Sequence, residues 1–384
     1  MRATQMTRHF DFSYGFVLKR RAASGLQLGG PHSRAMTHLF GWVYAMGQTA
    51  QITLDASFYR DPAVYESERR AVFGRSWLLF AHESQLSTPG SYVAAAAAGY
   101  PLIVVRGADN AIRAFHNVCR HRAGPLADDG AGKCEGALVC RYHGWRYALD
   151  GRLASARDFG PAADFDPRDY ALVGLRCESW RGFVFVNMDA DAPPLARSIA
   201  PLIARTDHLP LENFRFTHSS THDIACNWKT YVENYLEGYH IPLVHPFLNS
   251  AVDAAKYEVD VSAPVIFHQA PPRDGSPVAG LWAWAWPCLG VNVYAEGVLM
   301  ERMWPIDAHR TRLDYLYFFA DGIPRNEMER SVAASEITTA EDKSITEAVQ
   351  RNLDAGIYKA GRLSPKHEQG VAWFQGEIAR ALGR

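Results

Sequence analysis

Cys119-Arg120-His121 and Cys140-Arg141-Tyr142-His143 are the two short stretches that decide the fold of this chain. Each stretch pairs one thiol with one imidazole, separated by one residue in the first stretch and by two in the second. A [2Fe-2S] centre with two cysteines on one iron and two histidines on the other needs this mixed set. Neutral histidines in place of thiolates also raise the reduction potential of such a centre. We therefore expect Cys119, His121, Cys140 and His143 to bind a [2Fe-2S] cluster.

Two simpler uses of these residues fit the pattern less well. Zinc fingers usually place their cysteines together and their histidines together, whereas the two types alternate here. A disulfide between Cys119 and Cys140 leaves both histidines without a role. The flanking Gly124-Pro125 and Gly144-Trp145 favour the cluster, since small and rigid residues let two loops close over a buried inorganic core.

The longer stretches Cys119-Arg-His-Arg-Ala-Gly and Cys140-Arg-Tyr-His-Gly-Trp resemble Rieske non-haem iron oxygenases, the family of ring-hydroxylating dioxygenase α subunits. The resemblance covers roughly residues 52–380. It implies an α+β protein, in which an all-β Rieske domain precedes a helix-grip domain with an antiparallel sheet and helices around a substrate cavity. Short apolar runs separated by Asp-Gly and Asp-Asn turns agree, and they predict an antiparallel β domain with each cluster loop at a hairpin tip.

Four segments are expected along the chain. Residues 1–45 are rich in arginine and poor in acidic residues, and we expect a disordered extension. Residues 46–76 should hold an N-terminal helix that packs on the catalytic domain, capped by Asp61 with Pro62 in its first position. The Rieske domain is expected over 77–188 and the catalytic mononuclear iron domain over 189–384, which begins with a proline-rich linker.

A second metal site is predicted from His240 and His245, which lie five residues apart. On a regular helix this spacing turns the two side chains about 140° from each other. Both therefore face one ion only if the helix, expected over about 227–240, ends between them, and Pro242 supplies a break. Two histidines and one carboxylate form the metal site of non-haem Fe(II) oxygenases, which keeps positions open for O2 and substrate.

Asp342 is the candidate for the carboxylate ligand. It lies on a helix expected over about 326–355, spaced to share the inward face with an apolar stripe of Ile345, Val349 and Leu353. Glu341 is turned about 100° aside. The resembled family also takes its carboxylate ligand from an aspartate in a late helix, whereas an acidic residue on a solvated helix face is the alternative.

Two further candidate catalytic residues come from the resemblance. Glu237 matches an acidic residue that bridges the mononuclear iron to a cluster histidine of the neighbouring subunit, although most members have aspartate there. Asn234 matches an asparagine near the iron. For both, an ordinary polar position on a helix is the alternative.

Together these sites predict a terminal oxygenase that passes electrons from the Rieske cluster to mononuclear Fe(II) and uses O2 to hydroxylate a small organic substrate. No G-x-G-x-x-G fingerprint follows a predicted strand, so electrons should come from a separate NAD(P)H-dependent reductase, with or without a ferredoxin. The resemblance implies a homotrimer, with or without a small β subunit. The alternative is a Rieske electron-transfer protein fused to a ligand-binding helix-grip domain without catalytic iron.

The substrate is less well defined by the sequence. Trp282, Trp284 and Trp286 alternate along a predicted strand and share one face. There they can stack on an aromatic substrate or surround a quaternary ammonium, although packing against a helix is favoured for at least two of them. Residues 235–240 and 291–294 resemble the choline and glycine-betaine monooxygenase branch. Ring hydroxylation in aromatic hydrocarbon catabolism and N-demethylation of a methylated amine both stay open.

Composition narrows the partners further. The 384-residue chain has a net charge of -1 and no basic run with interleaved aromatics, which argues against nucleic acid. No apolar run approaches the roughly 20 residues needed to cross a bilayer, so no membrane association is expected. Six cysteines without a disulfide-like framework indicate a reducing cytoplasm.

Overall fold

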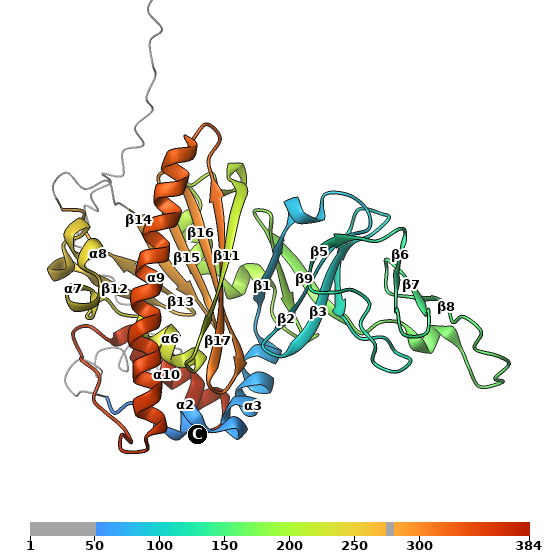
Figure 1. Cartoon of the computed structure of the whole chain (residues 1–384), viewed down its shortest axis with the longest axis horizontal. Helices are drawn as coiled ribbons and strands as arrows, with labels where there is room; N and C mark the ends of the chain where they lie inside the picture. The colour runs from blue at the N-terminus through green and yellow to red at the C-terminus, as the bar shows by residue number, and fades with distance from the viewer. Residues whose placement is uncertain (1–50, 274–279) are drawn as a thin grey trace, which may run out of the picture. The chain divides into compact units, whose positions relative to one another are not determined.

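The cluster motifs lie on an antiparallel β domain in a computed structural model that describes residues 51–273 and 280–384 (Figure 1). One sheet of this domain has the order β1-β10-β9-β4-β3-β2-β5, and a smaller sheet has the order β6-β7-β8. The expectation for residues 1–45 lies outside the described residues. The strands are β1 Leu78–His82, β2 Ser91–Ala97, β3 Tyr100–Arg106, β4 Ile112–His116, β5 Gly130–Lys133, β6 Ala137–Val139, β7 Arg146–Ala148, β8 Leu153–Ser155, β9 Gly174–Trp180 and β10 Phe183–Asn187.

The two cluster loops differ in how the strands hold them. Residues 140–145 connect β6 to its antiparallel partner β7, with Val139 opposite Arg146, so this loop is a hairpin tip as predicted. The first loop joins β4 to β5, and these strands pair with different neighbours. The expectation of a hairpin tip was therefore wrong for the loop that carries Cys119, because its two ends belong to strands that are not adjacent in the sheet.

A second seven-stranded sheet, antiparallel throughout, has the order β11-β17-β16-β15-β14-β13-β12. Its strands are β11 Arg215–Ile224, β12 Glu258–Ser262, β13 Val265–Gln269, β14 Gly280–Ala285, β15 Leu289–Tyr294, β16 Gly297–Asp307 and β17 Arg310–Phe319. Successive side chains along each strand point to opposite faces. The sheet consequently buries both faces, one in each of two separate apolar clusters.

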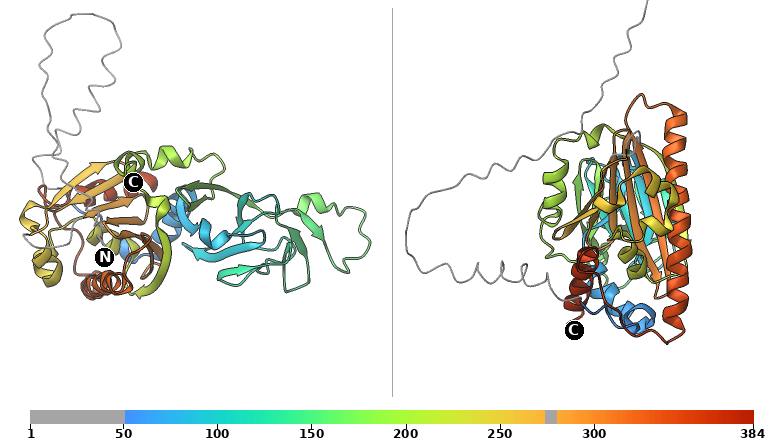
Figure 2. Two further views of the ribbon diagram at one scale, coloured as in Figure 1. Left: turned by 90° about the horizontal axis from the view of Figure 1, so that it is seen from above. Right: turned by 90° about the vertical axis from the view of Figure 1, so that its left-hand side faces the viewer.

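Helices α6 Trp228–Tyr235, α9 Arg325–Asp354 and α10 Gln369–Ala381 cover one face of this sheet (Figure 1; Figure 2). The opposite face packs against strands β1 and β10 and against α4 Leu195–Ser198 and α5 Ala200–Thr206. Two short helices, α7 Ile241–Val244 and α8 Pro246–Ala251, follow α6. Short 3-10 turns occupy Phe73–Arg75, Glu83–Leu86, Pro167–Tyr170, Leu211–Asn213 and Ala254–Lys256.

The described chain begins with α2 Ser57–Arg60 and α3 Pro62–Ala71. The predicted start of α3 is confirmed, since the Asp61 side chain accepts a hydrogen bond from the Ala63 N–H and Pro62 occupies the first turn. A buried ion pair ties α3 to α6, with Lys229 Nζ 2.6 Å from Glu68 Oε1. The Trp228 indole N–H donates to Glu68 Oε2 at 2.8 Å, so α3 fixes the start of the helix that leads into the second metal site.

The inward face of α9 is polar, contrary to the expected apolar stripe. Ile345 and Val349 are each 40% exposed. The buried positions are Thr339, Asp342, Thr346, Gln350 and Leu353. This face makes hydrogen bonds that an apolar stripe cannot make; for example, the Gln350 side chain accepts from the Asn227 N–H at 2.9 Å. Within the described part of the chain, neither α9 nor any other helix combines the length and the hydropathy needed to cross a membrane.

Candidate metal centres

The two cluster loops are held by matching backbone hydrogen bonds. The Cys119 N–H donates to the Gly124 carbonyl at 2.8 Å, and the Cys140 N–H donates to the Trp145 carbonyl at 2.9 Å. Each turn therefore closes directly behind its cysteine. The fixed turns hold the two thiols on neighbouring loops.

The four predicted cluster ligands meet at one place. Cys119 and Cys140 are both buried, and their thiols are hydrogen-bonding neighbours. The rings of His121 and His143 have centroids 4.6 Å apart, and His121 Nδ1 is buried without a hydrogen-bond partner. A Cβ on Gly124 would lie 2.8 Å from Cys140 Sγ, so this position leaves no room for a side chain. A pair of buried thiols and a pair of imidazoles, one of them with an unpartnered ring nitrogen, come from the same two loops and fit a [2Fe-2S] group with mixed ligands.

Two aromatic side chains support these ligands: Trp145, which flanks the second motif, and Tyr147, which the sequence analysis did not single out. Trp145 stacks on His121, with centroids 4.9 Å apart and ring planes at 10°. The Tyr147 hydroxyl lies 3.2 Å from Cys119 Sγ and accepts a hydrogen bond from the Arg120 N–H at 3.0 Å. Hydrogen bonds to cluster sulfurs tune reduction potential, and the Tyr147 hydroxyl is placed to make such a bond to Cys119 Sγ.

The second site begins where α6 ends. The helix expected to reach residue 240 stops at Tyr235, and the chain between it and α7 is not helical. Gly238 allows this turn, because a Cβ there would lie 2.5 Å from the ring of Tyr257. Pro242 is therefore not the break. It sits in the first turn of α7, where a missing N–H costs nothing.

His240, His245 and Asp342 come together as the possible ligands of one ion. The His245 Nε2 atom is 3.0 Å from His240 Nε2 and 3.0 Å from Asp342 Oδ1, and the remaining edge, His240 Nε2 to Asp342 Oδ1, is 3.7 Å. Ligand atoms about 2.1 Å from an ion and at right angles to each other stand about 3.0 Å apart. The three atoms therefore fit one triangular face of a metal ion, with the opposite face left to other ligands.

Each histidine is oriented by a carboxylate on its other ring nitrogen. His240 Nδ1 lies 2.5 Å from Glu237 Oε1, and His245 Nδ1 lies 2.7 Å from Glu341 Oε2. Burial alone would lower the pKa of His245, but the Asp342 and Glu341 carboxylates raise it above its usual value. Such a site favours a cation, and carboxylate–histidine pairs of this kind fix ligand geometry in metal sites. Glu341, set aside in the sequence analysis, thus contacts a metal ligand.

Asn234 also lies at this site, on the last turn of α6. Its Nδ2 donates to Asp342 Oδ1 at 2.6 Å. The hydrogen bond connects α6 to α9 and holds the same Oδ1 atom that lies 3.0 Å from His245 Nε2. The structure thus brings Asn234, Glu237 and the three candidate ligands into one cluster.

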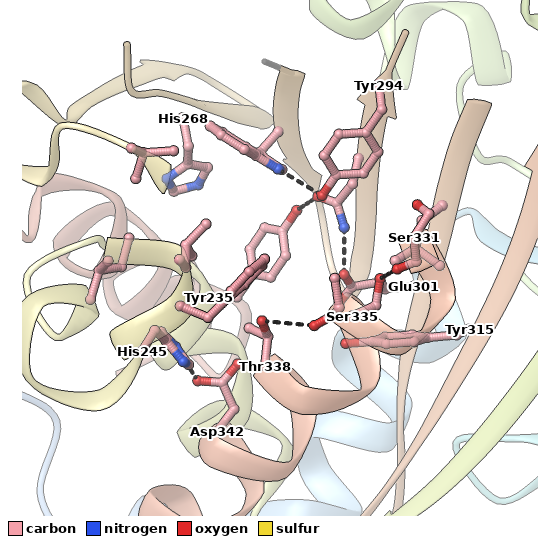
Figure 3. A pocket seen from close by; sticks show the side chains of 18 of the residues that line it. Tyr235, His245, His268, Tyr294, Glu301, Tyr315, Ser331, Ser335, Thr338 and Asp342 are labelled. Carbon is pink, nitrogen blue, oxygen red and sulfur yellow. Dashed lines mark hydrogen bonds and ion pairs between the residues drawn. The ribbon is translucent and has the colours of Figure 1, made fainter. Parts of the chain in front are cut away.

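A cavity of about 760 Å³ adjoins His240, His245 and Asp342 (Figure 3). One wall is the helix-covered face of the sheet, where His268, Trp282 and Asn292 are register partners on β13, β14 and β15. Facing partners in an antiparallel sheet point the same way, so these three side chains line the cavity together. The aromatic residues of the lining are Tyr231, Tyr235, Phe247, Tyr257, Trp282, Tyr294 and Tyr315.

Trp284 and Trp286 do not line this cavity, which corrects two of the three candidates for the substrate pocket. Both share a sheet face with Trp282, but α10 covers that part of the face. Their rings contact Trp373 and Phe374 at centroid distances of 5.6 to 6.4 Å. Alternation along a strand sets the face of a residue, whereas the covering element decides whether that face is core or cavity.

A buried carboxyl group, Glu301, lies in the same cavity and was not anticipated. It is 5% exposed and accepts a hydrogen bond from the Asn292 amide. Burial, with a smaller contribution from the charge of Asp342, raises the pKa of Glu301 to about 8. Its register partner across β16 and β17 is Tyr315. The alternation of side chains along β16 shows which residues share a face with Glu301. It does not show from the sequence that this face borders a cavity.

Comparisons with known proteins agree with this architecture. The Rieske [2Fe-2S] domain family matches residues 76–166, and the catalytic domain of the ring hydroxylating alpha subunit matches residues 211–277 and 267–384. The carnitine monooxygenase oxygenase subunit of Escherichia coli K12 is 32% identical, over 86% of this chain and 94% of its own. The chloroplastic choline monooxygenase of Spinacia oleracea is 27% identical, over 86% and 78% respectively.

A solved structure is also similar. It is a quaternary ammonium Rieske monooxygenase described for carnitine oxidation by gut microbiota and inter-subunit electron transfer. It superposes with a TM-score of 0.79 at 28% identity, covering 86% of this chain and 96% of that one. These matches support an oxygenase and not a Rieske carrier without catalytic iron. The chain therefore belongs to the Rieske non-haem iron oxygenases, terminal oxygenase subunits that use a Rieske [2Fe-2S] cluster, a mononuclear iron and O2.

Proposed function

We propose that this oxygenase hydroxylates a carbon bound to the nitrogen of a quaternary ammonium substrate. When this carbon is an N-methyl group, one oxygen atom of O2 enters a C–H bond, and the resulting hydroxymethyl group leaves as formaldehyde, which completes an N-demethylation. The observation that carries the proposal is the cavity beside the metal triad, where aromatic walls surround the buried carboxyl group of Glu301. Aromatic rings attract a quaternary ammonium through cation–π interactions. A nearby carboxylate adds a counter-charge in a region of low dielectric.

An aromatic hydrocarbon fits this cavity less well. A neutral arene gains from the rings but brings no positive charge to the buried carboxyl of Glu301, whose ionised form is costly to bury without one. The named relatives act on carnitine and choline. We therefore do not retain the earlier expectation of aromatic hydrocarbon catabolism.

We propose that the two motifs with cysteine and histidine bind the cluster and that the later histidines bind the mononuclear iron. Cys119, His121, Cys140 and His143 would hold the [2Fe-2S] cluster, and the mononuclear iron would be held by His240, His245 and Asp342. When bound, the two groups supply single-electron transfer and the activation of O2.

The protein side chains around the iron site have separate tasks in this proposal. Glu237 and Glu341 keep the two imidazoles oriented through their Nδ1 atoms. Asn234 holds the Asp342 carboxylate in place through its Nδ2 atom. The aromatic wall excludes water and positions the substrate cation, so that one methyl group faces the metal triad. Glu237 additionally lies at the point where electrons would enter from a neighbouring subunit.

An assembly is expected, because the similar structure is described with inter-subunit electron transfer. Apolar side chains are exposed beside both metal sites: Tyr142 is 56% exposed next to His143, and Tyr239 and Leu243 are 58% and 89% exposed next to His240. We propose that these surfaces meet in a homotrimer, which sedimentation can test.

A separate NAD(P)H-dependent reductase supplies electrons, and reconstitution with and without a ferredoxin or a small β subunit shows whether either is needed.

The division of the chain is part of the same proposal. We place the Rieske domain at 77–188 and the catalytic domain at 189–384, with α2, α3 and the 3-10 turn that follows them packed on the latter. Phe73 supports this packing, since its ring lies 4.8 Å from that of Trp228 on α6. We propose a cytoplasmic location, where the free cysteines of the described chain stay reduced.

Substrate-dependent consumption of NADH and O2 with a surrogate reductase tests the function. We expect turnover with carnitine or choline. The neutral isostere of choline, in which a tert-butyl group replaces the trimethylammonium group, should have a kcat/KM at least about tenfold lower. Naphthalene is the arene control. Equal turnover of the isostere, or turnover of naphthalene alone, would show that the cation is not what the cavity recognises.

A further inference from the structure

His268 is a buried polar residue of the cavity that the proposed reaction leaves without a role. It is 0% exposed, and neither Nδ1 nor Nε2 has a hydrogen-bond partner. Its ring lies between those of Tyr235 and Tyr257, at centroid distances of 5.7 and 5.9 Å. Figure 3 shows the imidazole among the side chains that border the cavity.

Such an imidazole needs a partner. Native proteins pair nearly all buried polar groups, and a buried donor and a buried acceptor that stay unpaired lower stability. An aliphatic side chain would fill the same space without that loss, as Ile266 does two residues earlier on the same strand face. A ligand with a polar group opposite His268 removes the penalty when it binds.

The protonation state of His268 limits what that group can be. Burial lowers the pKa of His268 to about 3, so the ring is neutral under physiological conditions. A neutral imidazole carries one N–H donor and one nitrogen acceptor. A hydroxyl group can use either of them, whereas a carboxylate needs donors and a positive charge in a buried place.

The charges of the cavity also argue against a ligand carboxylate as the group opposite His268. The carboxyl and guanidinium groups along its described lining are five acids and one base: Glu237, Glu296, Glu301, Glu327, Asp342 and Arg330. The Arg330 side chain is 72% exposed and already lies 3.7 Å from Glu327. No lysine or arginine among the described lining residues is thus available to pair with a carboxylate inside the cavity.

Tyr235 connects His268 to the cation site. Its ring contacts the imidazole, and its hydroxyl lies 2.5 Å from Asn292 Oδ1, while the Asn292 amide donates to Glu301. His268 and Glu301 therefore lie on either side of one tyrosine. A small molecule over this ring can place a cation toward the carboxyl and a polar arm toward the imidazole.

We infer that His268 is a specificity residue that hydrogen-bonds a hydroxyl group on the substrate, so that the enzyme prefers hydroxyalkyl trimethylammonium compounds over carboxylate-bearing ones. This inference rests on the proposed function and adds the chemistry of the second arm of the substrate.

The test compares three cations of similar size in the iron-loaded enzyme under anaerobic conditions. Choline has a hydroxyl, ethyltrimethylammonium lacks any oxygen, and glycine betaine has a carboxylate. Calorimetry should give choline a Kd at least about tenfold lower than either of the other two, as expected for one hydrogen bond that relieves a buried polar group. Equal affinities for choline and ethyltrimethylammonium, or tighter binding of glycine betaine, would overturn the inference while leaving the cation proposal in place.

The variants His268→Leu and His268→Asn separate recognition from packing. In His268→Leu the preference for choline over ethyltrimethylammonium should disappear, while the affinity for ethyltrimethylammonium stays within about threefold and the visible spectrum of the cluster is unchanged. His268→Asn, which keeps a donor and an acceptor, should recover part of the preference. A purely structural role would instead change the melting temperature and leave the preference intact. If none of the three cations binds, the proposed function fails and the inference falls with it.

Discussion

Glu301→Gln removes the buried counter-charge of the cavity while keeping its shape and the contact with Asn292. At an effective dielectric constant of about 20, a cation about 5 Å from a carboxylate gains about 3 kcal/mol. Because the pKa of Glu301 is about 8, ionising the group at pH 7 costs about 1.4 kcal/mol. The net gain of about 2 kcal/mol corresponds to a roughly 30-fold difference in affinity between the two proteins at pH 7.

The sign of the pH dependence follows from proton release. Below a pH of about 8 the carboxyl group of the free enzyme holds a proton, and the complex with a cation does not. The wild-type advantage should therefore grow about tenfold per pH unit up to the pKa and level off above it. The groups that interact with Glu301 are Asn292, Asp342 and the phenols of Tyr231, Tyr235, Tyr294, Tyr315 and Tyr317. Burial raises the pKa values of all five phenols, so they stay neutral over this range.

Calorimetric titration of both iron-loaded proteins with choline between about pH 6 and 9, without O2, measures this profile. Titrations in two buffers of different ionisation enthalpy give the number of protons that the protein releases on binding. We expect up to one proton per cation bound at pH 7 for the wild type, and none for Glu301→Gln. The position of the break reports the pKa of Glu301 in the iron-loaded enzyme. A flat wild-type profile, or equal affinities of the two proteins, would refute the view that this carboxyl group is the counter-charge.

Three further predictions concern the metal sites and the core. Asp342→Ala should abolish turnover and lose the mononuclear iron, while metal analysis and the visible spectrum show the two cluster irons retained; normal activity would remove this residue from the ligand set. Glu237→Gln should slow product formation about 10- to 100-fold with little effect on cluster reduction in stopped-flow assays, and equal slowing of both steps would argue against a role between the centres. Glu68→Gln should lower the free energy of unfolding by about 3–5 kcal/mol, because the buried ammonium of Lys229 loses its carboxylate partner and keeps only neutral acceptors such as Asn227 Oδ1. Urea denaturation should show most of this loss recovered in Glu68→Gln/Lys229→Met, and no recovery would place the loss elsewhere.

The sequence was sufficient to propose the two candidate sets of metal ligands. Cysteine and histidine side chains at fixed short spacings have few uses, so the pairs at Cys119 and Cys140 predicted a cluster without knowledge of the fold. His240 and His245 lie five residues apart, so they could bind one ion only if the helix were interrupted between them. Local geometry is enough for such inferences, because the ligands of each pair are neighbours along the chain.

Helix faces and helix ends were predicted less well, because neighbouring elements decide them. Ile345 and Val349 have the spacing of a buried stripe, yet they are exposed because the polar face of α9 bonds to α6 and to the sheet. The same packing turns Asp342 inward. It also brings Glu341 to His245, which no spacing on α9 alone indicates.

The lining of the cavity was decided by the tertiary structure alone. His268, Trp282 and Asn292 belong to three strands and meet only through their register, and Glu301 joins them from a fourth. Residue type and chain spacing determine which atoms can bind a metal, whereas strand pairing and the helices above the sheet determine which side chains border the same space. The sequence of this protein therefore predicts its candidate metal ligands. Its substrate recognition depends on contacts between residues far apart along the chain.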